Sequence, residues 1–230
     1  MRSVAATGDQ AVPPKPPVLP DAPTIGVDLG DLDELYPDID GLHADGEVLA
    51  LPEARTVDLL RTRLRGCTLD VPADCAVETR DAVLDGLDLV GRRIAGLVRT
   101  HLVRCRLSGT DLADASLEDV TFEDCALDMS SWRMARVRRV AVVGGRIDAL
   151  DLTGATLTDL SFSAVTMEGV VLDGTRCERV DLTAADLTPV TAVATLAGAT
   201  ISAAQAVALA ARMARALGVR VQGPGFPPSD

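Results

Sequence analysis

From Leu102 to Leu187, every fifth residue of the chain is apolar without a break. A second series lies two residues earlier, from Thr100 to Ala185, and consists mostly of small residues. Residues two apart point to the same side of an extended backbone, and the residues between them point to the other side. A period of five is neither the helical nor the strand period. The chain must therefore turn once every five residues to keep both series inside.

The segments that carry this period resemble the pentapeptide-repeat family, whose motif is A(D/N)LXX. The motif is seen in TDLAD (110–114), ASLED (115–119), LDLTG (150–154), ATLTD (155–159) and ADLTP (185–189). The resemblance implies an all-β solenoid, a right-handed quadrilateral β-helix in which four pentapeptides make one coil of 20 residues. Coils of this kind stack about 4.8 Å apart through backbone hydrogen bonds.

The repeats do not fill the whole chain, and composition divides it into five segments. We expect a disordered Pro-rich arm (1–24), an acidic lead-in that caps the N-terminal edge (25–55), the β-helix (56–201), a C-terminal helix (202–218) and a tail (219–230). Within the β-helix, Asp74 and Thr79 fall at expected inward positions, which predicts a loop or irregular coil over 70–82. The register also changes by three residues between Ile94 and Leu97.

The predicted helix follows the last repeat. Ser202 is a suitable N-cap and Gly218 a suitable C′ residue. Such a helix can cover the open edge of the last coil, which prevents end-to-end association. It can instead pair two protomers, so monomer and homodimer both stay open. The residues expected to make either contact are Val207, Ala210, Met213, Ala214 and Leu217.

No catalytic, cofactor or metal site is expected from the sequence. The cysteines (Cys67, Cys75, Cys105, Cys125 and Cys177) lack the spacing of a zinc site. Cys105 and Cys125 are one coil apart, which predicts stacked, reduced core residues. Neither His43 nor His101 lies near a nucleophile in sequence. An enzyme would need a deep pocket between the lead-in and the first coils.

One dense group of arginines is a candidate partner-binding patch. Its members are Arg133, Arg136, Arg138, Arg139 and Arg146, with Arg176 and Arg179 expected two coils further along the same face. Two interpretations stay open, a patch for an acidic partner and arginines neutralised by Glu118, Asp119 and Glu178.

The formal net charge of -12 opposes direct binding to nucleic acid or to an anionic membrane. The charge-free run from Leu187 to Ala211 is too rich in Ala and Thr to predict a membrane span. The N-terminus lacks the apolar stretch of a signal peptide, so a cytoplasmic location is expected. The absence of Asn and the single Lys15 beside many arginines indicate a GC-rich bacterial genome.

The leading interpretation is a noncatalytic scaffold that binds an unidentified protein partner. The alternative comes from the family resemblance, which includes DNA mimics that bind DNA gyrase and protect it from quinolones or toxins. Mimicry needs long acidic faces, whereas the outward residues here mix both signs and the face with Arg136, Arg138 and Arg139 is basic.

Overall fold

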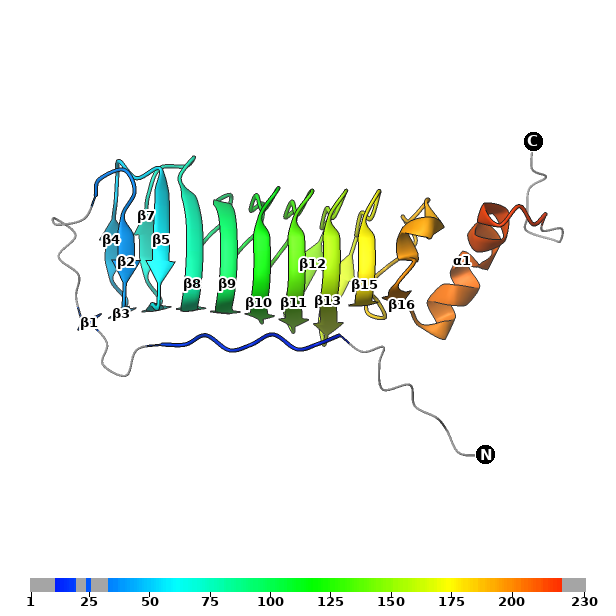
Figure 1. The fold of residues 1–230 in the computed structure, drawn as a ribbon, viewed down its shortest axis with the longest axis horizontal. Helices are drawn as coiled ribbons and strands as arrows, with labels where there is room; N and C mark the ends of the chain where they lie inside the picture. The colour runs from blue at the N-terminus through cyan, green and yellow to red at the C-terminus, as the bar shows by residue number, and fades with distance from the viewer. Residues whose placement is uncertain (1–10, 20–23, 26–32, 221–230) are drawn as a thin grey trace, which may run out of the picture.

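The computed structural model describes residues 11–19, 24–25 and 33–220, and within them the chain winds into a right-handed parallel β-solenoid closed by one helix (Figure 1). Most strands join one long parallel sheet, and the pairs β12–β14 and β4–β7 form two short ones. The elements are β1 (Thr24–Ile25), β2 (Asp38–Asp40), β3 (Leu42–Asp45), β4 (Val48–Ala50), β5 (Thr56–Leu60), β6 (Arg63–Arg65), β7 (Thr68–Asp70), β8 (Ala76–Asp85), β9 (Arg93–Val103), β10 (Ser116–Glu123), β11 (Arg136–Val143), β12 (Arg146–Asp148), β13 (Thr156–Ser163), β14 (Thr166–Glu168), β15 (Arg176–Asp181), the 3₁₀ helix η2 (Val193–Leu196), β16 (Ala199–Thr200) and α1 (Ala203–Ala216).

The strand register confirms the 20-residue coil. Leu117 pairs with Val137 of the next coil, and Val137 pairs with Leu157 of the coil after that. Equivalent residues of successive coils therefore stack on one another. The apolar series from Leu102 to Leu187 is buried at every position except Cys177, which is half-buried.

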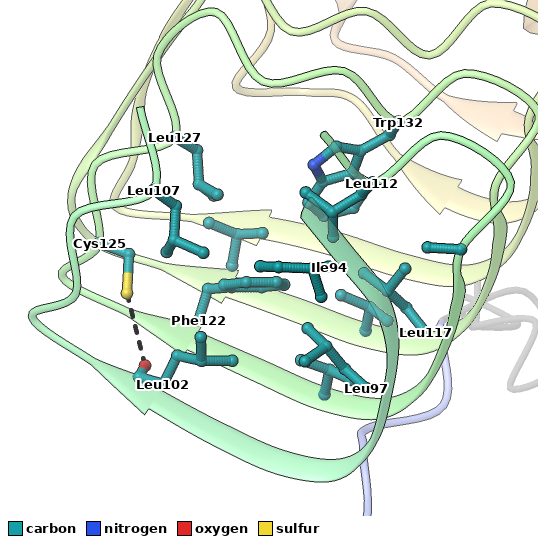
Figure 2. Close-up of a cluster of buried hydrophobic side chains, with 14 of the residues drawn as sticks. Ile94, Leu97, Leu102, Leu107, Leu112, Leu117, Phe122, Cys125, Leu127 and Trp132 are labelled. Atoms are coloured by element: carbon teal, nitrogen blue, oxygen red, sulfur yellow. Dashed lines mark hydrogen bonds between the residues drawn. The ribbon is translucent and has the colours of Figure 1, made fainter. Parts of the chain in front are cut away.

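The core is a column of mostly aliphatic side chains, in which Phe122 and Trp132 form an aromatic pair (Figure 2). Phe122 and Trp132 are fully buried, and their ring centroids lie 5.6 Å apart at 39°. Trp132 therefore sits inside the coil. Offset or tilted ring pairs of this kind contribute about 0.5–1.5 kcal/mol beyond the area they bury.

The solenoid begins earlier than the expected boundary at residue 56. Strands β2, β3 and β4 pair in register with β5, β6 and β7, so residues 38–50 form a coil and not a separate cap. The reason is that the period of five extends through Ile39, Ala44, Leu49 and Ala54, which all point inward. Residues 26–32 of the expected lead-in lie outside the described residues.

The expected loop at 70–82 is largely a strand. Asp74 is exposed, and the neighbouring Cys75 takes the inward position before β8 begins. Thr79 is buried, and its hydroxyl lies 2.6 Å from that of Thr100, so the core satisfies its polar atom. The true irregularity is a register shift at Val77/Glu78 opposite Ile94 and Gly96.

The C-terminal helix α1 starts at the expected N-cap. The Ser202 hydroxyl accepts from the Gln205 N–H, and the Gln205 side chain accepts from the Ser202 N–H, which is a capping box. Gly218 follows α1 with a φ of 75°. In the described ranges, no helix has the length and apolarity needed to cross a membrane.

Candidate functional site

One longitudinal edge of the solenoid carries a regular series of charged residues. Each coil passes this edge through one left-handed residue, with φ between 44° at Arg99 and 83° at Gly198. The residues in order are Gly41, Arg61, Asp81, Arg99, Asp119, Arg139, Asp159, Arg179 and Gly198. Acids and bases alternate from Arg61 to Arg179. We call the six residues from Asp81 to Arg179 the Asp–Arg ladder.

Each arginine of the ladder binds the aspartate of the preceding coil with two nitrogens. Arg99 donates to Asp81 at 2.6 and 2.5 Å, and Arg139 donates to Asp119 at 2.6 and 2.6 Å. Arg179 donates to Asp159 at 2.6 and 3.0 Å. The three carboxylates are nearly buried, with side-chain exposures of 9%, 5% and 6% in chain order. Bidentate pairs of this kind are the stronger class of charged hydrogen bond.

The Pro-rich segment 11–19 lies along this edge and runs opposite to the direction in which the coils stack (Figure 1). The N–H groups of Val12, Lys15 and Val18 each donate a 3.0 Å hydrogen bond to the ladder. Their acceptors are the Oδ1 atoms of Asp159, Asp119 and Asp81, in that order. We call residues 11–19 the arm.

The arm differs from the disordered segment expected from its composition. Ala11, Pro14 and Pro17 are half-buried against the solenoid, whereas Val12 and Lys15 expose their side chains. Residues 1–10 and 20–23 of the same expected segment lie outside the described residues. Composition indicated an extended chain, but it could not show that the surface presents acceptors at matching intervals.

The contacts hold the ladder carboxylates in their charged form. For Asp81, Asp119 and Asp159, the hydrogen bond from the paired arginine is the main cause that lowers the pKa. Burial raises the pKa of each carboxyl, and the N–H of the arm lowers it. The net pKa shift is downward for all three, so the aspartates are anionic at neutral pH.

The sequence pointed to Asp119 as a partner of the neighbouring arginines, but not to Asp81, to Asp159 or to the ladder that the three aspartates form. The signal was present, because an acid or a base recurs two residues after the centre of one face in each coil from residue 61 to 179. A second signal was the spacing of the non-proline residues 12, 15 and 18 within the run of prolines.

The predicted arginine patch is only partly assembled. The register places Arg136 and Arg176 in one row through Thr156, and Arg138 is exposed beside them. Arg139 was expected to point outward, but it is buried against Asp119 and Glu118. Its burial follows from its place in the ladder, where its left-handed backbone turns the side chain along the edge.

The other predicted arginines are held elsewhere. Arg133 pairs with Asp151 at 2.8 Å and Arg146 pairs with Asp128, on two other faces. Arg179 is bound to Asp159 and Glu178. Neutralisation by neighbouring carboxylates therefore describes Arg133, Arg139, Arg146 and Arg179, whereas Arg138 has only a 3.8 Å contact with Glu118, and Arg136 and Arg176 have no ion pair within the described residues. We call these last three arginines the arginine face.

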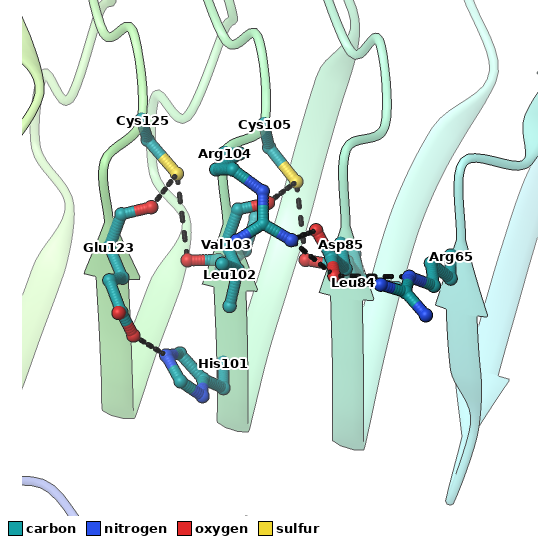
Figure 3. A network of polar contacts seen from close by, with 10 residues as sticks. All are labelled: Arg65, Leu84, Asp85, His101, Leu102, Val103, Arg104, Cys105, Glu123 and Cys125. Atoms are coloured by element: carbon teal, nitrogen blue, oxygen red, sulfur yellow. Dashed lines mark hydrogen bonds and ion pairs between the residues drawn. The ribbon is translucent and has the colours of Figure 1, made fainter.

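In the central coils, the thiols are hydrogen-bonded to backbone carbonyls and the imidazole of His101 is paired with a carboxylate (Figure 3). Cys125 donates to the Leu102 and Glu123 carbonyls, and Cys105 makes the equivalent bonds one coil earlier. A hydrogen bond with Cys105, together with burial, raises the pKa of the Cys125 thiol. His101 Nε2 lies 2.8 Å from Glu123 Oε2 on the surface.

The remaining chemistry-bearing groups are dispersed. Burial raises the pKa of the Cys177 thiol to about 11, so it is a weak nucleophile at neutral pH. Over the described ranges, no three His, Cys, Asp or Glu residues converge as a metal site. A groove between η2 and α1 is lined by Thr191, residues 192–194, Arg212, Arg215 and Ala216, without a carboxylate, imidazole or thiol.

Helix α1 contacts the last coil with a different set of residues from the one predicted. Leu209 is buried at 2% exposure and Met213 packs against the core. Of the predicted set, Val207, Ala210 and Leu217 are exposed to solvent. The predicted stripe includes Met213 but not Leu209, which lies on the same face of the helix as Met213, one turn earlier.

Comparison with known proteins places this architecture in a class. The fold is a β-solenoid of five-residue repeats, and residues 97–128 and 151–188 match the family described as Pentapeptide repeats, in 8 copies. The resemblance to the pentapeptide-repeat family is therefore confirmed, and the chain carries genuine pentapeptide repeats. No curated protein matches the chain.

Solved structures are similar to the solenoid at low identity. A trypsin-treated form of QnrB1, a plasmid-mediated fluoroquinolone resistance protein, is 16% identical over 80% of this chain and 99% of that chain, with a TM-score of 0.41. HetL, a pentapeptide-repeat protein involved in heterocyst differentiation regulation from the cyanobacterium Nostoc, is 19% identical over 67% of this chain and 77% of that chain, with a TM-score of 0.31. These likenesses assign no partner to this chain.

Proposed function

We propose that the protein is a noncatalytic cytoplasmic scaffold that binds an acidic protein partner through the arginine face. The observation that carries the proposal is the row formed by Arg136, Thr156 and Arg176 on adjacent coils, with Arg138 exposed beside it. Stacked coils hold these side chains at fixed intervals on a rigid surface, which suits recognition of an extended acidic segment.

The arginine face differs from the ladder because its charges are available. Arg138 lies 3.8 Å from Glu118, and its side chain is 61% exposed. An exposed pair at this distance contributes about 0–1 kcal/mol, so the guanidinium can exchange partners at little cost. The five free thiols agree with a reducing compartment, which supports the cytoplasmic part of the proposal.

The gyrase alternative requires an uninterrupted acidic surface that imitates DNA phosphates. Along the ladder edge each aspartate alternates with an arginine that binds it, so this edge presents no continuous negative row. A supercoiling assay with purified gyrase separates the two functions. Inhibition of supercoiling, or relief of quinolone inhibition, would favour the gyrase alternative over the scaffold.

Site-specific photocrosslinking in the native host tests the scaffold directly. A photoreactive residue at position 136 is expected to capture one dominant acidic protein. The same residue at Ser163, which is exposed at the end of β13, is the matched control and is expected not to capture it. The charge reversal Arg176→Glu in the 136 variant should reduce the capture. Equal capture from positions 136 and 163 would contradict the proposal.

A further inference from the structure

The contact between the arm and the ladder has a repeat of its own. Val12 lies over Asp159, Lys15 over Asp119 and Val18 over Asp81. Each step of three residues along the arm therefore spans two coils of the solenoid. A polyproline II helix advances about 3.1 Å per residue, or about 9.3 Å in three residues. Two coils at about 4.8 Å advance about 9.6 Å. The two repeats therefore stay in phase.

The prolines of the arm also fit the hydrogen-bonding pattern of the ladder. Pro13, Pro14, Pro16 and Pro17 have no N–H, so they leave no donor unsatisfied against the surface. A polyproline II helix has three residues per turn, which brings every N–H of an x-Pro-Pro repeat to the same side. All three donors of the arm consequently face the three carboxylates.

We propose that the Asp–Arg ladder is a binding site for polyproline II segments of the form x-Pro-Pro-x-Pro-Pro-x. The arm is its resident ligand, and a segment of the same spacing in another protein replaces it. The proposal concerns the ladder edge and does not require the arginine face to bind a partner.

The contacts show why the ligand need not be the arm itself. All three hydrogen bonds use backbone N–H groups of the arm, and the side chains of Val12, Lys15 and Val18 point into solvent. Binding therefore depends on the spacing of the N–H donors and the prolines, and not on which residue stands at x. The anionic carboxylates favour a neutral or basic segment, as the lowering of the Asp119 pKa by Lys15 illustrates.

The same geometry defines what the site rejects. Arg99 and Arg139 occupy the coils between the aspartates, so a segment shifted by one coil would place its N–H groups opposite guanidinium donors instead of carboxylate acceptors. An all-proline segment keeps the helix but has no donor at any position. Donor spacing is therefore separable from polyproline II propensity by experiment.

The test uses the full chain in two matched forms. Val12→Pro/Lys15→Pro/Val18→Pro removes the three donors and frees the ladder, whereas Val12→Ala/Lys15→Ala/Val18→Ala keeps them. The probe is a fluorescein-labelled peptide with the sequence AVPPKPPVL, and the control peptide is APPPPPPPL. Binding is followed by fluorescence anisotropy. In the parent chain, hydrogen exchange by NMR reports on the N–H groups of Val12, Lys15 and Val18.

The donor peptide is expected to bind the triple-Pro chain at least tenfold more tightly than the triple-Ala chain, and the all-proline peptide is expected not to bind. In the parent chain, excess donor peptide should speed exchange at all three amides. Equal binding of the two peptides, or no binding of the donor peptide to the triple-Pro chain, would overturn the proposal. A parent dimer that the triple-Pro change dissociates would make a second copy the occupant and would also overturn it.

Discussion

Arg139 closes over Asp119 of the preceding coil, with Nε and Nη2 each 2.6 Å from a carboxylate oxygen, while Nη2 also lies 2.6 Å from Glu118. Both partners of the main pair are nearly buried, at 10% and 5% side-chain exposure. The pair joins two coils at the edge where the arm also binds. It therefore couples the stability of the solenoid to the occupancy of that edge.

Removal of the Asp119 carboxylate should destabilise the solenoid. Breaking one partner of a buried pair costs about 3–5 kcal/mol, and Glu118 remains to hold Arg139, so we expect a loss of about 2–3 kcal/mol for Asp119→Ala. The control Arg106→Ala removes an ion pair with Asp88 whose side chains are 67% and 56% exposed. It should change the free energy of unfolding by less than about 0.5 kcal/mol. Urea denaturation measures both, and equal losses would show that burial of the ladder pair is unimportant.

Acid should destabilise the protein through the ladder. Asp81, Asp119 and Asp159 have a lower pKa when folded than when unfolded, mainly because of their arginine partners. Their contribution is therefore fully present above the unfolded value of about 3.9 and is lost as pH falls through the lower folded pKa values. Thermal midpoints between pH 7 and pH 2 should be flat at first and then fall below about pH 4. The variant with Asn at all three positions should lose most of this acid slope; a slope equal to the parent's would refute the assignment.

The sequence predicted the solenoid because the large residue at the centre of each face is repeated without interruption from Leu102 to Leu187. The predicted start of the solenoid at residue 56 was too late, because Ala44 and Ala54 are small and weaken the apolar period. The period becomes recognisable in this segment only from the stacking of Ile39 and Leu49 on the next coil. The ladder was missed for another reason. Asp119 was expected to neutralise a neighbouring arginine, but only the coil register reveals that its partner is Arg139 and that the same pair recurs at Asp81 and Asp159.

Glycine at the corners should be required at some coils and replaceable at others. Gly145 has a φ of 76°, and a Cβ there would lie 2.1 Å from the Cys125 carbonyl oxygen. Gly109 has a φ of 66° with no atom within 4 Å of such a Cβ. Gly109→Ala should cost about 1 kcal/mol, which is the left-handed strain alone. Gly145→Ala should cost clearly more, because backbone must move. Urea denaturation of the two variants checks this, and equal losses would contradict the steric argument.

Helix α1 should act as a cap on the last coil. Its Gln205 amide donates to the Leu182 and Ala185 carbonyls at 2.9 and 2.7 Å, and Arg212 donates to the Thr188 and Val190 carbonyls at 2.7 and 2.8 Å. These bonds satisfy acceptors that an open sheet edge would offer to another molecule.

Leu209→Glu places a charge under the helix, where Leu209 is 2% exposed, and should release α1 from the coil. The freed edge is then expected to associate, so light scattering should detect species larger than the parent. Val207→Glu is the matched control, because Val207 is 77% exposed on the same helix, and it should keep the parental mass. A halved mass for Val207→Glu would instead assign the exposed stripe of Val207 and Leu217 to a homodimer contact. An unchanged mass for Leu209→Glu would show that the edge is protected without the helix.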